Sequence, residues 1–300
     1  MNLGELFERF PDDETAEKWF VENRWEHGIR CAYCDSNNVN THAAHATMPY
    51  RCRDCDKRFS VKTNSIMHAS NIGYQKWVIV IYLVTTHPKG VSSMQLHRDL
   101  GITQKTAWYM LHRIREAWKT NKSVFGGEVE IDETYIGGKE GNKHADKKLH
   151  AGRGTVGKIP VVGVKHRETN QVYAEVAEDT KKATLQEFVV ENTTQDATVY
   201  TDEAKAYIGM PRKHESVRHS IGEYVNDQIH TNGIESFWAI LKRGYKGVYH
   251  KMSRKHLQRY IVEFQERYNS KALDTITRMA IIVKGSVGKR LRYQDLIAEV

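Results

Sequence analysis

The chain has 300 residues, of which 40% are hydrophobic and 27% are charged. This composition is typical of a soluble globular protein with room for two or three domains, and it excludes an intrinsically disordered chain. The net charge is +8, and residues 242–300 hold 14 Lys and Arg against 5 Asp and Glu. The basic excess at this end indicates a face that binds a polyanion, with a merely solvated basic end as the alternative.

The first ten residues carry two acids and no apolar core follows them, so no signal peptide is predicted. The longest apolar run, 77–84, is far too short to cross a bilayer. We therefore expect a cytoplasmic protein that has no membrane partner. In a reducing compartment, four cysteines within 25 residues favour a metal site over disulfides.

A first helix is predicted to begin at Asp12 or Asp13, and it leads into two cysteine pairs of identical spacing. The pairs are separated by 17 residues, which is the arrangement of a zinc ribbon, and the predicted ligands of a structural Zn²⁺ are Cys31, Cys34, Cys52 and Cys55. Because four thiolates complete such a site, we interpret His42 and His45 as surface residues. Basic residues around the second pair favour contact with nucleic acid. We assign 1–68 to this N-terminal helix and ribbon.

Residues 69–122 are predicted to form a DNA-binding helix-turn-helix domain. After a helix or buried segment over 74–86, a short helix ends near Leu100, Gly101 makes a turn, and a longer helix runs from Thr103 to Trp118. An ordinary helical hairpin is the alternative. The predicted buried stripe of the longer helix is Ala107, Leu111, Ile114 and Trp118. The residues left on its exposed side, which could lie in a major groove, are Lys105, Tyr109, His112 and Arg113.

From residue 123 the composition becomes strand-like. Residues 128–138 predict a β-strand closed by a Gly-Gly turn, in which Val129, Ile131 and Tyr135 alternate with polar residues and Asp132 lies halfway along. Burial of a carboxylate is costly unless it is paired or bound to a cation, so Asp132 suggests a partner or a metal. An acid on a solvated face of the strand is the alternative.

Further elements follow in the same segment. A hairpin is predicted over 161–166 and 171–177, a helix over 184–191, and a strand over 197–201 that ends at Asp202. The last signal is a helix that begins near Asn232 and contains Glu235. Asn-x-x-Glu is also a capping box, in which Glu235 would only satisfy backbone donors.

Two acids on adjacent strands and a third on a helix beside them can gather oxygen ligands around two divalent cations. This arrangement predicts a site that cuts phosphodiesters. Lys242 stands seven residues after Glu235, about two helical turns, and would face a DNA phosphate.

The order of these motifs resembles that of the zinc-ribbon group of bacterial insertion-sequence transposases. The resemblance covers residues 10–270 and rests, beside the ribbon, on Glu-Ile-Asp-Glu-Thr-Tyr-Ile-Gly-Gly, Tyr-Thr-Asp-Glu, His-Thr-Asn-Gly-Ile-Glu-Ser-Phe-Trp, Leu-Lys-Arg-Gly, Gly-Val-Tyr-His and Glu-Phe-Gln-Glu-Arg-Tyr-Asn. It implies a multidomain α+β protein of bacterial type that acts at the nucleoid, in which an α/β ribonuclease H-like catalytic domain with a mixed sheet spans 123–270. Residues 271–300 match no motif, and we assign them to a basic C-terminal tail.

The resemblance also implies a reaction. Asp132, Asp202 and Glu235 would bind Mg²⁺ or Mn²⁺, Lys242 would be the basic residue after the third acid, and Arg243 would contact DNA. Some members of the group have Asn as the third residue, which leaves Asn232 as the alternative to Glu235.

The implied activity is that of a DDE transposase, which binds the terminal inverted repeats, cleaves the ends of the element and joins its 3′-hydroxyls to target DNA. The partners would be double-stranded DNA and a second copy of the chain, in a homodimer or larger assembly. Two other functions are compatible with these motifs. One is a ribonuclease H-like nuclease or resolvase that cuts without joining, and the other is a zinc-dependent DNA-binding regulator without catalysis.

Overall fold

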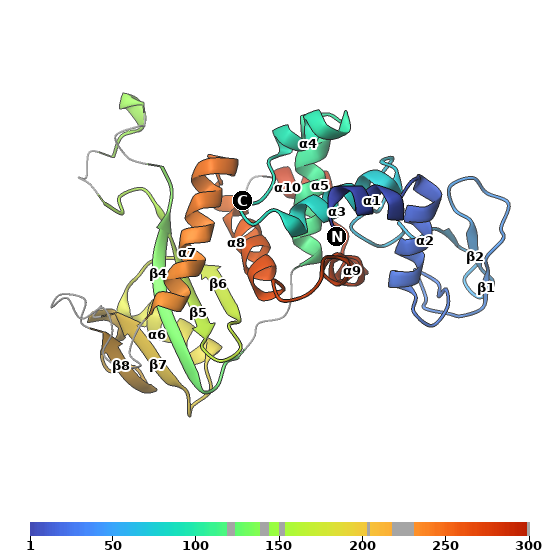
Figure 1. The fold of residues 1–300 in the computed structure, drawn as a ribbon. Coiled ribbons are helices and arrows are strands. Elements are labelled where there is room, and N and C mark those ends of the chain that lie inside the picture. The colour runs from blue at the N-terminus through green and yellow to red at the C-terminus, as the bar shows by residue number, and fades with distance from the viewer. Residues whose placement is uncertain (119–123, 139–143, 150–153, 203–204, 218–230, 299–300) are drawn as a thin grey trace. The chain divides into compact units, whose positions relative to one another are not determined.

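The computed structural model describes the chain except for residues 119–123, 139–143, 150–153, 203–204, 218–230 and 299–300 (Figure 1). The described chain divides into two compact units. Unit 1 comprises residues 1–87, 91–120 and 272–300, and unit 2 comprises residues 88–90 and 121–271. The chain thus leaves unit 1 and returns to it at its C-terminal end.

Unit 1 is mostly helical, with three short strands. Its elements are α1 (Leu3–Arg9), α2 (Asp13–Arg24), β1 (Val39–Asn40), β2 (Tyr50–Cys52), β3 (Arg58–Phe59), α3 (Tyr74–Thr86), α4 (Ser93–Leu100), α5 (Gln104–Ala117), α9 (Thr275–Gly285) and α10 (Tyr293–Ile297).

The predicted helices of unit 1 are present, and their ends follow from capping residues. Asp12, Ser92 and Thr103 each accept a hydrogen bond from a backbone N–H in the first turn of α2, α4 and α5, respectively. Gly101 ends α4 in the left-handed conformation, at φ 62°, which glycine adopts without strain. Sequence reasoning missed α1, although Asn2 and Glu5 form a capping box at its start.

The segment predicted as a basic C-terminal tail contains the helices α9 and α10. Its residues 272–300 belong to unit 1, where α9 packs against α2, α3 and α5, and Lys271 belongs to unit 2. Met279, Ile282 and Val283 of α9 are buried in this contact. The basic residues of the segment therefore surround a helix whose apolar face completes the core of unit 1.

Unit 2 is built on a five-stranded mixed sheet in the order β6-β5-β4-β7-β8. The strands β4, β5 and β6 are antiparallel neighbours, and β4, β7 and β8 are parallel neighbours. The elements are β4 (Glu128–Ile136), β5 (Ile159–His166), β6 (Val172–Val176), α6 (Lys182–Asn192), β7 (Thr198–Asp202), β8 (Lys213–Val217), α7 (Asn232–Gly244), a π-helical turn (Tyr245–Tyr249) and α8 (Arg254–Asn269), with short 3-10 helices at Ala145–Lys147 and Lys205–Tyr207.

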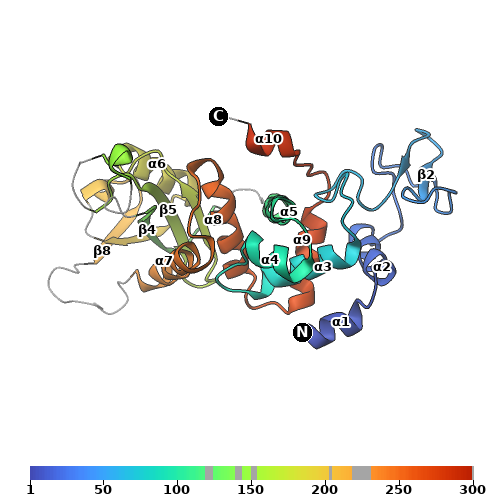
Figure 2. The same ribbon diagram turned by 90° about the horizontal axis from the view of Figure 1, so that it is seen from above.

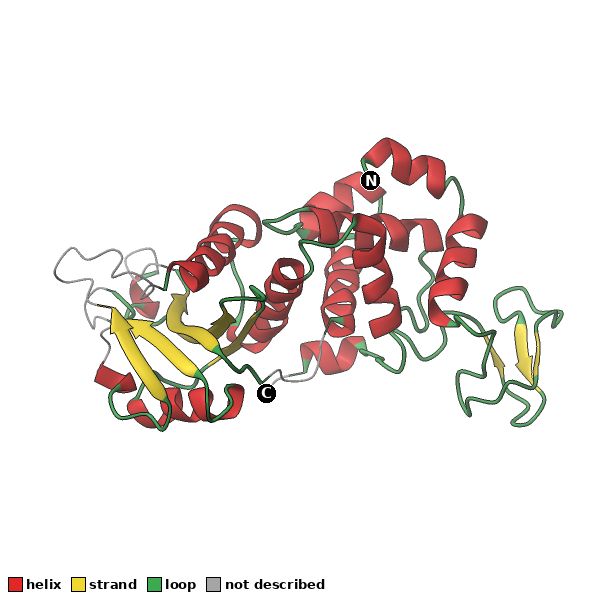
Figure 3. Cartoon of the chain, turned by 60° about the horizontal axis from the view of Figure 1, so that its bottom comes forward, coloured by secondary structure: helices red, strands yellow, loops and turns green. Residues whose placement is uncertain are grey.

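Helices cover both faces of this sheet. The buried side chains of α7 and α8 form one cluster with Ile136 and Val161, and those of α6 form another with Val129 and Ile131. The ribbon shows α7 and α6 on opposite sides of β4 and β5 (Figure 2), and the strands, drawn in yellow, have helices on both sides (Figure 3). Strand β4 lies in the middle of the sheet. Asp132 is half-buried and Glu130 is 1% exposed, so the alternative that Asp132 lies on a solvated face is wrong.

Helix α8 also protects the outer strand β6. Its side-chain amides accept hydrogen bonds from the backbone N–H groups of β6: Gln258 from Val176 at 2.8 Å, Gln265 from Ala174 at 3.1 Å and Asn269 from Val172 at 2.8 Å. The edge of the sheet is thereby paired, which removes donors that would attract another strand. This contact also fixes α8, and α7 beside it, over the sheet.

Candidate functional site

The four cysteines converge on one point in unit 1. Their sulfur atoms all lie within 4.8 Å of one another. The Sγ atoms of Cys31 and Cys55 are 3.6 Å apart, and those of Cys34 and Cys52 are 3.7 Å apart. These separations are too long for disulfides and match the distance of about 3.8 Å between two sulfurs of a tetrahedral zinc site. The donor set therefore fits a structural zinc ion.

The local backbone explains how each pair presents its thiolates. The residue after each second cysteine, Asp35 or Asp56, has a positive φ, 60° and 57°, so both knuckles make the same tight turn. Beneath the sulfurs, Tyr50 and Phe59 are buried with their rings 5.4 Å apart. A ribbon with so small an apolar cluster depends on the metal for much of its stability.

The prediction for helix α5 is half right. All four residues of its predicted buried stripe are buried. On the side predicted to be exposed, however, His112 is 0% and Arg113 is 7% exposed, so this part of the prediction is wrong. Lys105 is exposed and Tyr109 is half-buried.

The C-terminal segment explains part of this difference. The Tyr109 hydroxyl donates to the carbonyl of Leu291 at 2.6 Å, and its ring packs on Tyr293 at 5.4 Å. The Lys105 ammonium lies 4.4 Å from the Tyr293 ring, and the Arg113 guanidinium stacks 4.2 Å from the Tyr109 ring. Residues 291–293 therefore cover the face of α5 that sequence reasoning left for DNA.

The two predicted strand acids of unit 2 come together. The parallel register pairs Glu128 with Thr198 and Glu130 with Tyr200, where the paired stretch ends, and the same register continued for two residues would bring Asp202 level with Asp132. The odd-numbered residues Val129 and Val199 face α6, so both carboxylates point to the opposite face, under α7. Their charges interact, since Asp202 is one cause of the raised pKa of Asp132.

Asp132 is held in a defined orientation. Its Oδ1 accepts a hydrogen bond from the backbone N–H of Glu133 at 2.8 Å, and its Oδ2 accepts one from the Trp238 indole N–H at 3.0 Å. Burial, followed by the charges of Glu133 and Asp202, raises the pKa of Asp132 to about 7, and these two hydrogen bonds oppose the rise. Such clustered carboxylates are an arrangement that a divalent cation would stabilise.

Helix α7 lies parallel to strand β4 with a fixed alignment. The backbone N–H of Ile234 donates to Glu130 at 2.9 Å, and Trp238 donates to Asp132 at 3.0 Å. From Ile234 to Trp238 the helix advances about 6 Å, and from Glu130 to Asp132 the strand advances about 6.6 Å. The two contacts are therefore compatible with a helix that runs alongside the strand. Trp238 also lies over Gly163, where an added Cβ would stand 2.7 Å from its ring.

The start of α7 corrects one interpretation. The N-cap is Thr231, which makes no side-chain capping bond, and Asn232 is the first helical residue. Asn232 is therefore not the N-cap, and the predicted Asn-x-x-Glu capping box does not form at this helix start. Instead the buried carboxylate of Glu130 accepts from the first turn, a role that sequence reasoning missed.

The third acid does not join the other two in this structure. Glu235 is exposed, and in the described part of the chain only the four cysteines gather closely enough to share one ion. Its place on α7 is nevertheless defined. Phe237 and Gly244 face α8, and Glu235 lies on the opposite edge of α7, on the side of the sheet where β7 carries Asp202.

The basic residues of α7 point in different directions. Lys242 is two turns after Glu235 on nearly the same edge and lines a pocket with the end of β4. Arg243 is exposed, and its Nε donates to the carbonyl of Ala239 in its own helix at 3.1 Å. Glu133 also lines this pocket, and its carboxylate accepts a hydrogen bond from the Tyr207 hydroxyl at 2.8 Å. Sequence reasoning did not single out Glu133, although it directly follows Asp132.

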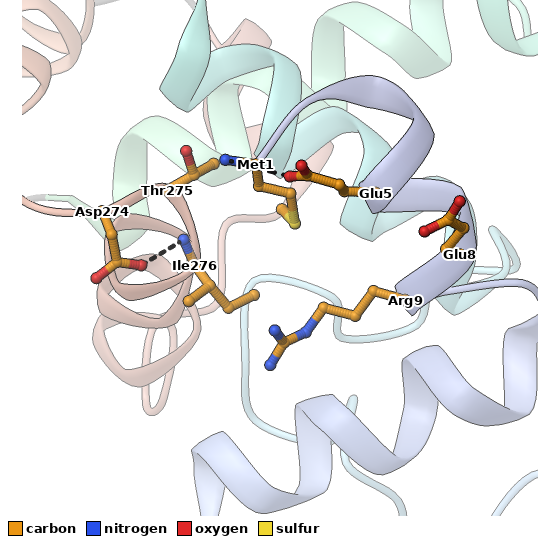
Figure 4. Close-up of a pocket in the computed structure, with 7 residues that line it drawn as sticks. All are labelled: Met1, Glu5, Glu8, Arg9, Asp274, Thr275 and Ile276. Atoms are coloured by element: carbon orange, nitrogen blue, oxygen red, sulfur yellow. Dashed lines mark hydrogen bonds and ion pairs between the residues drawn. The ribbon is translucent and has the colours of Figure 1, made fainter.

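A second pocket lies in unit 1 between α1 and the start of α9 (Figure 4). Two of its acids already act as helix caps: Glu5 accepts from the Asn2 backbone N–H, and Asp274 accepts from the Ile276 and Thr277 N–H groups. We therefore assign these acids to helix stability.

None of the described helices is long and apolar enough to cross a membrane.

Comparison with known proteins identifies the class of unit 2. Residues 124–269 match the ISXO2-like transposase domain family. The chain is also 27% identical over 291 residues to an uncharacterized protein in the transposable element ISH50 of Halobacterium salinarum, in a match that covers 91% of this chain and 98% of the relative. Residues 124–269 therefore resemble an ISXO2-like transposase domain, and the predicted resemblance to insertion-sequence transposases is confirmed.

Proposed function

We propose that this protein is a DDE-type transposase that cleaves the ends of an insertion sequence and joins the 3′-hydroxyls to target DNA. One observation carries the proposal: Asp132 and Asp202 lie on adjacent parallel strands and their charges interact, and the helix packed on β4 bears Glu235 and Lys242. The mixed sheet with helices on both faces supports a ribonuclease H-like architecture for this unit. The transposase-family domain supports the same conclusion.

The acids would hold Mg²⁺ or Mn²⁺. When bound, these ions activate the attacking hydroxyl and stabilise the leaving oxygen of an in-line displacement. The chain supplies the orientation: the Trp238 indole and the Glu133 backbone N–H each occupy one lone pair of Asp132 and leave the others for a ligand. Two adjacent acids beside Asp202 give the site the negative charge that such cations need.

For the third ligand we favour Glu235 over Asn232. Both side chains are exposed, but a carboxylate neutralises cationic charge and an amide does not. Glu235 also shares its helix edge with Lys242, whereas Asn232 lies at the first position of the helix. A change of the Glu235 rotamer, or a small shift of α7, would complete the site when metal and DNA bind.

Unit 1 would recognise the terminal inverted repeats. The α4–α5 pair has the element order and the glycine turn of a helix-turn-helix, and the ribbon carries basic residues. Of the four α5 residues expected at DNA, Lys105 is exposed on the face that residues 291–293 border. DNA contact at α5 would therefore involve Lys105 first. Two ends must be held together for joining, so we propose a homodimer or larger assembly.

The test uses the full chain, a labelled duplex that ends in the native terminal repeat, and a supercoiled target plasmid. Products are compared with Mg²⁺, with Mn²⁺ and with chelator. We expect cut ends and joined products only with metal. Cleavage without joining would instead favour a nuclease or resolvase, and sequence-specific binding without strand breakage would favour a regulator.

A matched control is available on the same strand. Glu128 begins β4, and its side chain is 49% exposed. Glu128→Gln should leave cleavage and joining unchanged, which separates the proposed metal acids from a general requirement for negative charge on β4. A loss of joining in this variant equal to that of Asp132→Asn would contradict the assignment.

A further inference from the structure

A pocket of about 460 Å³ lies at the end of strand β4, beside the proposed catalytic acids. Its charged and aromatic lining consists of Glu133, Tyr135, Lys158, Lys242, Tyr245 and Lys246. The volume is within the range of roughly 300–1,000 Å³ that small-molecule sites occupy. A double helix is far too wide to enter such a space, whereas one nucleotide fits.

The charge of the pocket is suited to an anion. Lys158, Lys242 and Lys246 bring ammonium groups to its wall, and Glu133 is its acid among the described lining residues. The Tyr207 hydroxyl already donates a hydrogen bond to the Glu133 carboxylate. The lysines therefore outweigh the acid, and a phosphate is the anion that they would hold.

The sequence places these groups by helix geometry. Lys242, Tyr245 and Lys246 stand at positions i, i+3 and i+4 and so share one side of α7 where it continues into the π-helical turn. This turn is closed by the His250 N–H, which donates to the Tyr245 carbonyl at 2.7 Å. π-helical turns are rare and occur often at functional sites.

The opposite wall is equally fixed. Gly137 follows β4, and an added Cβ there would meet the Lys158 backbone at 3.1 Å. Lys158 is half-buried and directly precedes β5. The close approach of these two backbones fixes Lys158 beside the end of β4, and Lys158 lines the pocket together with Lys242 and Lys246. The lining thus comes from the end of β4, from α7 with its π-helical turn, and from Gly154, Thr155 and Lys158 of the loop before β5.

We propose that this pocket binds one nucleotide of the DNA strand that passes the catalytic acids. Lys158 and Lys246 would hold its phosphate, and the ring of Tyr245, which is half-buried against the core, would form the wall for its sugar and base. This inference rests on the proposed function, because the pocket begins at Glu133, the neighbour of Asp132. Lys242 lines the pocket and follows Glu235 by two turns of α7, so the strand would run from Glu235 along α7 towards Lys246.

The experiment measures binding in the absence of divalent metal, so it does not depend on catalysis. Fluorescence anisotropy with a labelled terminal-repeat duplex would be recorded over a range of salt concentrations for the wild type, Lys158→Ala, Lys246→Ala and the control Lys251→Ala. Lys251 is an exposed lysine in the same unit that does not line the pocket. Circular dichroism would verify the fold of each variant.

We expect each pocket variant to bind about threefold to fivefold more weakly, as for loss of one exposed charge contact. The slope of log K against log salt should fall by about 0.7–0.9 for each lost phosphate contact, and Lys251→Ala should change neither quantity. A duplex with a single neutral methylphosphonate would then be scanned through the positions near the cleavage site. At the contacted phosphate, the methylphosphonate and Lys246→Ala should cost no more together than either costs alone.

Unchanged affinity and salt slope in both pocket variants would overturn the inference, even if joining were intact. Losses of affinity that add at every methylphosphonate position would also overturn the inference. The lysine would then act through the overall positive potential of the protein and would not contact one phosphate. Conversely, a protein that joins no DNA could still show this non-additive loss for Lys246→Ala and one methylphosphonate. That result would refute the transposase function and support the nucleotide pocket. Tyr245→Phe should bind like the wild type and Tyr245→Ala should bind more weakly. Equal binding by these two variants would exclude the ring as a wall of the site.

Discussion

The contact between Glu130 and helix α7 gives the strongest prediction about stability. Glu130 is 1% exposed, accepts a hydrogen bond from the Ile234 N–H at 2.9 Å, and pairs with the Arg167 Nε at 3.3 Å. In Glu130→Ala the buried Ile234 N–H has no acceptor, and Arg167 loses the buried carboxylate with which it pairs. Losses of this kind cost about 3–5 kcal/mol. Because α7 carries Trp238 and Glu235, the substitution should also loosen the catalytic face.

The matched control removes an exposed acid that pairs with the same arginine. Glu128 lies 3.7 Å from the Arg167 guanidinium, and its side chain is 49% exposed, so Glu128→Ala should cost no more than about 1 kcal/mol. The assay is thermal unfolding of the full chain, with hydrogen exchange to locate the effect in unit 2. For a unit of this size we expect Glu130→Ala to lower Tm by roughly 6–15 °C.

Glu130→Gln separates the effect of the hydrogen bond to Ile234 from the effect of the negative charge. The amide oxygen can still accept from the Ile234 N–H, but the charge that faces Arg167 is lost, so the variant should lie between the wild type and Glu130→Ala. Equal, small changes in Tm for Glu130→Ala and Glu128→Ala would refute the reasoning. Unaltered exchange in the first turn of α7 would refute it as well.

Three other substitutions test separate parts of the account. Gly163→Val would push a side chain into the Trp238 ring, because an added Cβ alone would stand 2.7 Å from it. The substitution should reduce joining at least tenfold, with little change in DNA binding by anisotropy. The Trp238 hydrogen bond lowers the pKa of Asp132, which is about 7, so Trp238→Phe should raise this pKa. The pH at which Mn²⁺ binding is half-maximal should then move upward in calorimetric titrations. An unmoved pH midpoint would show that the indole does not act on the carboxylate. Cys34→Ser should abolish the bound zinc measured by atomic absorption and expose the ribbon to protease, whereas a full zinc content would contradict the four-thiolate site.

The sequence predicted local structure well where short-range rules decide it. The buried stripe of α5 follows helical periodicity, and the cysteine spacing sufficed to bring four sulfurs within 4.8 Å. The hairpin of β5 and β6 turns through Asn170 at a φ of 57°, as its turn residues indicated. In each case the interacting residues are near in sequence or carry a spacing with one common explanation.

The failures come from partners that are distant in sequence. Tyr109 was expected to be free for DNA, but its hydroxyl bonds to Leu291, 182 positions later. Glu130 was read as an alternating polar residue, and its acceptor role depends on Ile234, 104 positions later. Periodicity shows which side of an element is apolar, but it does not show which other element covers the polar side.

The candidate site shows the same division. The places of Asp132 and Asp202 in the sheet could be predicted, because Asp132 lies within a recognisable strand pattern and Asp202 ends one. These two strands are parallel neighbours in the sheet. The position of Glu235 could not be predicted, because it depends on how α7 is docked by Glu130, Trp238 and α8. No short-range pattern encodes that docking.

The most direct test of the central claim is strand joining by single-acid variants. Purified Asp132→Asn, Asp202→Asn, Glu235→Gln and Asn232→Ala would be compared with the wild type on the terminal-repeat duplex and target plasmid in Mn²⁺. We expect the first three to lose cutting and joining while they still bind the duplex, and Asn232→Ala to remain active. Joining by Asp132→Asn or Asp202→Asn at the wild-type rate would contradict the proposed site, and activity in Glu235→Gln with inactivity in Asn232→Ala would transfer the third position to Asn232.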